Sequence, residues 1–448
     1  MTLTRSAAAL GAVAILAGAA AGCRSGSSST SSSAAPAKLV VWRMGSSVPS
    51  QVTWMNGVVA QFHKKFPAYA KTKVVVDWIP WGNRVTDWTN ALTSGKGGPD
   101  ITELGNTDTP GIAAQGALAN ISPQVHSWSS GSGIIPGNLA NDTVNGQTYA
   151  VPWFGGVRGI WYRKDEFAKA GISSAPTTWS QLVADAKLLQ QKFPGTYGLG
   201  APSNYTNAIV SFIWGAGGQV ATRSGGKWTA KLTSPQSEAG LKFYADLYLT
   251  QHVSPSKYIG QTELGAPGAT SGGSDEDFAL GKLDMYIDGP WAGSEMTTVS
   301  TKYKADWAAF PIPSETGPNP APAFSGGSDL GVWVKSKYQQ ADWALLSVMD
   351  SPSNATTFAN AQGFFPEFTA QLKGGAYAGN PVMAGFAKAA AYTQIAPLNS
   401  KNWATADATD AIIPTMMKSL MLGANFTATV SKANTELQNV LNTGSETG

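Results

Sequence analysis

The chain has 448 residues, with 31 Lys or Arg and 28 Asp or Glu, so its formal net charge is +3. So weak a positive excess, with no basic cluster, gives no support for a nucleic-acid partner. The length suffices for two or three ordinary domains. Only 13% of residues are charged, against 16 Trp, 16 Phe and 13 Tyr. This favours a ligand recognised by rings and uncharged polar groups, unless most of the rings simply fill a large core.

The N-terminal segment predicts export. Arg5 precedes an apolar run, 7–21, which ends in small residues directly before Cys23. A basic start and a short apolar stretch are typical of a secretory signal, here 1–22. The pattern resembles a bacterial lipobox, with Cys23 as the lipidated first residue of the mature chain; secretion with an unused cysteine is the alternative. Residues 23–37, rich in Ser, Ala and Gly, predict a flexible tether.

The first part of the mature chain alternates β-runs with helices. Apolar residues every four positions from Trp54 to Phe66 predict a helix that Pro67 ends. Such an alternation argues for a mostly parallel sheet covered by helices. The other elements expected here are β-runs at 38–42, 74–79 and 101–104 and a short helix at 111–119.

Two β-runs, 149–154 and 159–163, flank Gly155 and Gly156. Glycine permits sharp backbone changes, so we expect the chain to bend here and to cross between two lobes. Local capping signals then predict two helices. The first runs from Asp165 to Gly171, and the second begins at a capping box formed by Thr178 and Gln181.

The second half continues the same alternation, with no internal repeat. Segments 260–273 and 311–327 are rich in Gly and Pro and are expected to be loops. From residue 340 onward the pattern is mainly helical. The other expected elements are β-runs at 197–199, 227–232, 285–287, 307–310 and 331–334, and helices near 182–193, 207–214, 235–248 and 274–281.

The stretch 146–179 holds several motifs in order: Gly146, Tyr149 to Trp153, Tyr162 to Asp165, and Thr178-Trp179. Together they resemble the hinge segment of extracellular solute-binding proteins of sugar-importing ABC transporters. Three more blocks carry the likeness, so it spans nearly the whole mature chain. These blocks are Gly97 to Ser122, Phe278 to Met296 and Phe310 to Lys337.

The resemblance implies a two-lobed α/β fold of the periplasmic-binding-protein type (type II), with discontinuous lobes, a hinge and a central cleft. The division it implies is lobe 1 at 38–150, lobe 2 at 151–300, a return to lobe 1 at 301–360, and a helical part, mainly of lobe 2, at 361–448.

Catalysis finds little support in the motifs. The three histidines are far apart, and no HExxH, CxxC or GxSxG pattern occurs, so we expect no metal, no cofactor and no enzyme activity. Glycoside hydrolysis needs only two carboxylates in a cleft, which keeps a secreted glycoside-processing enzyme as the alternative. Its candidates are Asp275, Glu276, Asp277 and Asp288, although the first three also suit the start of a helix.

A sugar has apolar C–H faces on which rings stack, and hydroxyls that pair with Asp, Asn, Arg and backbone groups. We therefore look for rings beside glycines and for polar residues at strand ends. A structural role is the alternative for three residues. Trp153 would then pack at a hinge, Arg158 would pair with a local acid, and Asp108 would cap a helix. Trp81 stays open. The predicted ligand-binding residues are Asn106, Thr107, Trp153, Phe154, Arg158, Asp288, Trp291, Gly327, Ser328, Asp329 and Phe364.

The function expected from this resemblance is delivery of an oligosaccharide to ABC permease subunits by a monomer. The protein would be a lipoprotein on the outer face of the cytoplasmic membrane, touching the membrane through its lipid alone. Segments 105–108 and 326–329 look most like members that bind N,N′-diacetylchitobiose. Cellobiose, maltose and trehalose remain alternatives.

Overall fold

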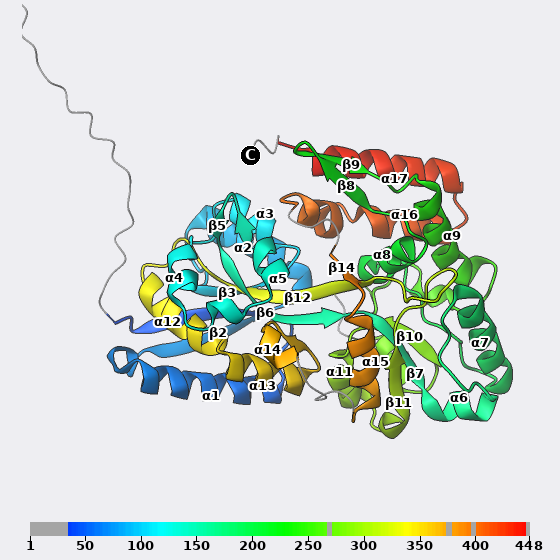
Figure 1. The fold of residues 1–448 in the computed structure, drawn as a ribbon, viewed down its shortest axis with the longest axis horizontal. Coiled ribbons are helices and arrows are strands. Elements are labelled where there is room, and N and C mark those ends of the chain that lie inside the picture. Colours follow the sequence, from blue (N-terminus) through cyan, green and yellow to red (C-terminus); the bar gives the residue numbers. More distant parts are fainter. Residues whose placement is uncertain (1–34, 267–270, 373–378, 396–399, 445–448) are drawn as a thin grey trace, which may run out of the picture.

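The computed structural model describes residues 35–266, 271–372, 379–395 and 400–444. The predicted signal, Cys23 and nearly all of the tether therefore lie outside the described residues. Two α/β bodies lie side by side, and strands run between them (Figure 1). We call the body around the larger sheet lobe 1 and the body around the smaller sheet lobe 2. Within the described ranges, no helix combines the length and apolar character needed to cross a membrane.

Lobe 1 is built on a seven-stranded sheet with the order β13-β6-β12-β3-β1-β2, and β14 pairs with β12. β1 runs parallel to β2 and β3, whereas β12 is antiparallel to both β3 and β6. The sheet is therefore mixed, not mostly parallel as expected. Its strands are β1 (Lys38–Met44), β2 (Lys73–Ile79), β3 (Ile101–Gly105), β6 (Ala150–Val157), β12 (Ala323–Val332), β13 (Phe365–Pro366) and β14 (Thr393–Gln394).

Helices pack on this sheet through apolar stripes. In α1, Val58 and Phe62 of the predicted stripe are buried, and Trp54 and Phe66 are partly buried. Met55, which was not in the predicted stripe, is also buried. The helices of lobe 1 are α1 (Pro49–Lys65), α2 (Arg84–Ser94), α3 (Thr109–Ala114), α4 (Ser122–Ser127), α5 (Pro136–Asn141), α12 (Gln339–Met349), α13 (Pro352–Gln362) and α14 (Thr369–Leu372), and β4 (Thr143–Val144) with β5 (Gln147–Thr148) forms a hairpin.

Lobe 2 is built on an antiparallel sheet of order β10-β7-β11, made of β7 (Gly159–Arg163), β10 (Met285–Asp288) and β11 (Trp307–Phe310). A large apolar cluster joins this sheet to α8, α9, α16 and α17. The remaining elements are α6 (Lys164–Ala170), α7 (Trp179–Lys192), α8 (Thr206–Gly215), β8 (Ala221–Ser224), β9 (Lys227–Ala230), α9 (Pro235–Leu249), α10 (Ser274–Ala279), α11 (Ala292–Val299), α15 (Pro381–Ala389), α16 (Ile412–Met421) and α17 (Phe426–Leu441).

The first crossing between the lobes differs from the predicted glycine bend. β6 continues through Gly155 and Gly156 to Val157, and neither glycine has a left-handed φ. The glycines are needed for close approach instead. A β-carbon on Gly155 would lie 2.2 Å from Glu367 Oε1, and one on Gly156 would lie 2.4 Å from the Trp291 ring. Only Arg158 separates β6 from β7.

The return to lobe 1 begins later than residue 301. β11 pairs with β7 in the sheet of lobe 2, so the chain re-enters the large sheet only at β12. β12 also takes up the end of the expected loop 311–327. After it, β13 pairs with β6, which places Phe365 and Pro366 with lobe 1, not with the helical C-terminal part.

Candidate functional site

The turn after β3 is held against β12. The backbone N–H of Asn106 donates to Gly327 O at 3.1 Å, and its Nδ2 donates to Ser325 O at 3.2 Å. Asn141, the last residue of α5, donates from Nδ2 to Asn106 O at 2.6 Å. These bonds fix Asn106 at the carboxyl end of β3, the edge at which open α/β sheets bind ligands.

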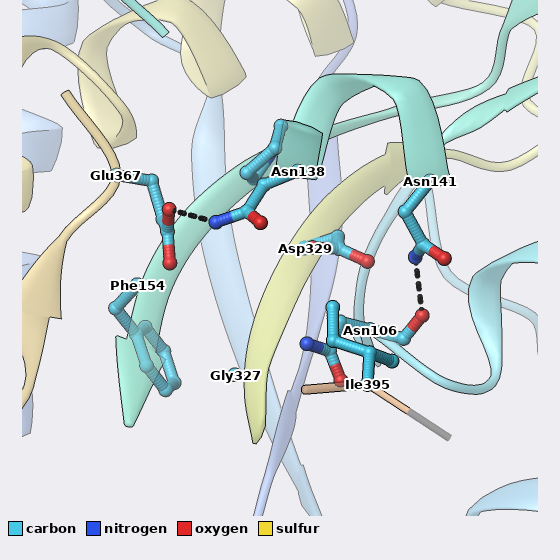
Figure 2. Close-up of a pocket in the computed structure, with 9 residues that line it drawn as sticks. Asn106, Asn138, Asn141, Phe154, Gly327, Asp329, Glu367 and Ile395 are labelled. Carbon is cyan, nitrogen blue, oxygen red and sulfur yellow. Dashed lines mark hydrogen bonds between the residues drawn. The ribbon is translucent and has the colours of Figure 1, made fainter. Parts of the chain in front are cut away.

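A small pocket lies beside this turn (Figure 2). Four predicted residues line it: Asn106, Phe154, Gly327 and Asp329. Distant segments supply the others, and no sequence motif marks them, because only the fold brings them together. The residues that the sequence analysis missed are Asn138, Asn141, Pro152, Glu367 and Ile395.

Buried carboxyl groups form one wall of the pocket. Asp329 is 3% exposed and accepts a hydrogen bond from Thr109 Oγ1 at 2.6 Å; Glu367 is 6% exposed and accepts one from Asn138 Nδ2. Burial raises the pKa of both groups to about 7. Burial and the adjacent Asp329 also hold the pKa of Asp142 well above its usual range. These acids therefore keep protons up to near-neutral pH.

A row of three rings in contact connects the pocket to lobe 2. The Phe154 ring, in the pocket wall, lies 4.2 Å from the Phe364 ring, and Phe364 stacks on Trp291 at 5.4 Å. Phe364 packs against the core of lobe 1 and Trp291 against that of lobe 2, and both are half-buried. The Arg158 guanidinium lies 4.6 Å from the centre of the Trp291 ring. Four predicted residues thus form one continuous contact between the lobes.

Arg158 and Asp288 are linked through a tyrosine that the sequence did not indicate. Arg158 Nε donates to Tyr205 OH at 3.2 Å, and Tyr205 OH donates to Asp288 Oδ1 at 2.8 Å. Burial raises the pKa of Asp288 to about 6, although the positive charge of Arg158 acts in the opposite direction. The acid that Arg158 reaches is therefore not a local one. Asp288 lies 130 residues further along the chain, and Arg158 reaches it only through Tyr205.

Trp153 is placed differently from the sequence-based prediction. Its side chain is 0% exposed and stacks on Phe358 at 4.4 Å, with Trp54 at 5.5 Å and the Arg43 guanidinium at 4.2 Å. In a strand that alternates faces, Trp153 points into the core of lobe 1 while its neighbour Phe154 lines the pocket. Trp153 is therefore a core residue in this conformation.

Trp81, whose role the sequence does not decide, is 40% exposed. It follows β2 and lies over Gly105, where an added β-carbon would be 3.5 Å from its ring. Arg84 binds Asp108 through two hydrogen bonds of 2.6 and 3.2 Å and lies 5.6 Å from the Trp81 ring centre. Asp108 precedes α3 but makes no capping bond with its side chain. Trp81 thus offers an accessible ring beside Asn106.

Seven predicted residues do not line the pocket. Five of them are described above, and the other two are Ser328 and Thr107. Ser328 is 1% exposed, and Thr107 is half-buried. The acids Asp275 and Asp277 lie in the first turn of α10, as expected from their suitability for a helix start. Asp277 also accepts a hydrogen bond from Tyr258 OH at 2.6 Å. Across the described residues, no three His, Cys, Asp or Glu side chains gather in a way that could hold a metal ion.

Two α/β lobes joined by strands, with a polar pocket on lobe 1 and a ring contact between the lobes, define a two-lobed ligand-binding protein. The family model for bacterial extracellular solute-binding proteins matches residues 45–356. The chain belongs to this family, so it is an extracellular or periplasmic binding protein and not an enzyme.

Individual relatives agree with this assignment. The diacetylchitobiose binding protein DasA of Streptomyces coelicolor is 28% identical over 352 residues, which cover 76% of each chain. A mannitol-binding protein of Pseudomonas aeruginosa is 28% identical over 258 residues, or 56% of this chain and 55% of that protein.

Solved structures confirm the fold. Maltose-bound MalE3 of T. maritima superposes with a TM-score of 0.77 at 22% identity, covering 90% of this chain and 99% of that one. The GacH receptor of Streptomyces glaucescens gives a TM-score of 0.76 at 20% identity, covering 91% and 98%. The expected periplasmic-binding-protein architecture is therefore confirmed.

Proposed function

We propose that this protein binds an oligosaccharide outside the cytoplasmic membrane and delivers it to the permease subunits of an ABC importer. The observation that carries this proposal is the pocket itself. Amide and carboxyl groups from several segments converge there on the ring of Phe154, and the Phe364–Trp291 stack continues from it toward lobe 2. Sugar hydroxyls need such polar groups, and sugar C–H faces need such rings.

N,N′-diacetylchitobiose is the first ligand to test. The likeness to DasA supports it, as does the placement of Asn106 and Gly327, which belong to the segments that resemble chitobiose binders, in one pocket. Cellobiose, maltose and trehalose are the alternatives, because the same groups suit other disaccharides.

Closure of the lobes would be the transport signal. A ligand shifts an open–closed equilibrium only if it touches both lobes in the closed state. Arg158, between β6 and β7, is at the crossing and contacts Trp291, so we assign the movement to this crossing and to β12. The closed form would then dock on the permease as a monomer. Cys23 would tether it to the membrane through lipid.

Isothermal titration calorimetry and thermal unfolding test the proposal with these four disaccharides. A bound sugar should stabilise the folded chain by about 2.7 kcal/mol at a concentration one hundred times its Kd. Trp291→Ala should weaken the binding by about 1–3 kcal/mol, by analogy with the loss of a stacked base. Absence of heat and of thermal stabilisation with all four sugars at millimolar concentration would exclude these ligands, and the same result with amino disaccharides as well would refute the proposal.

A further inference from the structure

The three asparagines of the pocket are held with their nitrogens bonded to the protein. Nδ2 of Asn106 donates to Ser325 O, Nδ2 of Asn138 to Glu367 Oε2, and Nδ2 of Asn141 to Asn106 O. The partners of Asn106 and Asn141 are backbone carbonyl oxygens, which can only accept, so these two bonds settle which end of each amide is nitrogen. Nδ2 of Asn138 faces the Glu367 carboxyl group, which accepts from it when ionised. No other described residue donates a hydrogen bond to the three Oδ1 atoms, which remain acceptors for a ligand.

The two carboxyl groups of the pocket add further acceptors. An ionised carboxylate has about four acceptor sites. Glu367 uses one on Asn138, and Asp329 is hydrogen-bonded to Thr109 and to the Asp142 carboxyl group. No Lys, Arg or His is among the residues that line the pocket. A cavity closed by two buried carboxyl groups and three amide oxygens therefore lacks a positive partner among the described residues.

Two more acidic groups lie behind this wall. Asp142 is fully buried against Asp329, and the fully buried Asp350 interacts electrostatically with both Glu367 and Asp329. Burying carboxylates without a cation is costly, so buried carboxyl groups are either protonated or paired with a cation. The raised pKa values of these acids indicate that they are protonated in the unliganded chain. A cationic ligand would instead pair with them in their ionised form.

We propose, on the basis of the sugar-binding function above, that this pocket binds a protonated primary amine carried by the sugar. The preferred ligand is then an oligosaccharide with at least one amino sugar that is not acetylated. An ammonium group brings three donors and a positive charge, whereas a hydroxyl brings one donor and no charge. An acetamido group brings a carbonyl oxygen that needs a donor.

Three β-1,4-linked disaccharides that differ only at C2 test this inference by calorimetry: cellobiose, chitobiose with free amines, and N,N′-diacetylchitobiose. Chitobiose should bind roughly tenfold or more tightly than the other two, the effect of one hydrogen bond to a charged group. Titrations in two buffers of different ionisation enthalpy should show proton release at pH 6, because the ammonium ionises carboxyl groups that were protonated. The preference should persist at pH 7.

Glu367→Gln and Asp329→Asn are the matched variants, because each keeps an oxygen for its side-chain donor and loses the charge. Each should reduce the ratio of chitobiose to cellobiose affinity by roughly tenfold. Glu315→Gln, which changes an exposed residue outside the pocket, should leave all three affinities unchanged. Circular dichroism spectra checked against the unmodified protein confirm folding, and either folded pocket variant suffices for the test.

The possible outcomes are distinct. Equal or tighter binding of a neutral disaccharide overturns the amine inference and leaves the sugar-binding function standing. A chitobiose preference that both folded pocket variants retain also overturns it, because the amine then binds elsewhere. No binding by any disaccharide overturns the proposed function together with the inference. Loss of the preference in a folded pocket variant alone supports the inference.

Discussion

Trp153→Ala should destabilise the fold far more than it weakens ligand binding. The indole is 0% exposed and packs on three partners, the Phe358 ring at 4.4 Å, the Trp54 ring at 5.5 Å and the Arg43 guanidinium at 4.2 Å. Truncation of such a ring to Ala leaves a cavity and costs about 3–5 kcal/mol of unfolding free energy. Arg43, buried beside Glu103, also loses an aromatic partner for its charge.

Trp81→Ala is the matched comparison. The Trp81 ring is 40% exposed and borders the Asn106 turn, so its loss creates no internal cavity. We expect a change in unfolding free energy within about 1 kcal/mol, because that side chain is largely solvated. If a sugar stacks on this ring, the affinity should fall by about 1–3 kcal/mol.

Urea unfolding followed by circular dichroism, together with calorimetric titration of a bound disaccharide, separates the two effects. The expected result is a lowered unfolding midpoint for Trp153→Ala and a weakened titration for Trp81→Ala. The reasoning fails if Trp153→Ala unfolds at the same urea concentration as the unmodified protein but no longer binds sugar. Trp153 would then be a ligand-contacting ring that another conformation exposes.

Three further predictions concern other parts of the chain. Gly156→Val should displace the Trp291 ring, 2.4 Å from an added β-carbon, and calorimetry should show weaker sugar binding; unchanged affinity would place Trp291 outside the site. For Asp329 the folded-state pKa, about 7, exceeds the unfolded value, so the folded state binds more protons and stability should fall as pH rises from about 4 to about 8. Asp329→Asn should flatten that decline in urea titrations, and an unaltered slope would contradict it. Cys23→Ser should release the protein into the medium, as fractionation of cells would show; a membrane-bound variant would rule out lipidation at Cys23.

Local features were predictable because their causes are local. The Thr178–Gln181 capping box forms both of its bonds, and Gly171 ends α6 in a left-handed conformation. β11 occupies the predicted range 307–310. Side-chain oxygens three residues from a backbone N–H, or a glycine after a helical turn, act over a few residues of chain, so a sequence alone displays them.

Features that depend on distant partners were not predictable. Trp153 and Phe154 are adjacent and alike in sequence, yet only Phe154 reaches the pocket, because Phe358, some 200 residues later, covers Trp153. Glu367 has no motif around it and acquires its place only when β13 pairs with β6. The mixed sheet depends in the same way on β12, whose Gly-rich and Ser-rich sequence hides a strand with partners on both sides.

The position of β12 also governs when the chain can fold. β12 lies between β3 and β6 in the large sheet, although it comes more than 160 residues after β6 in the chain. Until Val332 has emerged during synthesis or export, β3 and β6 have no strand between them, and the large sheet of lobe 1 lacks β12. Contacts of such wide sequence separation form slowly. We therefore expect lobe 1 to assemble only after β12 has emerged.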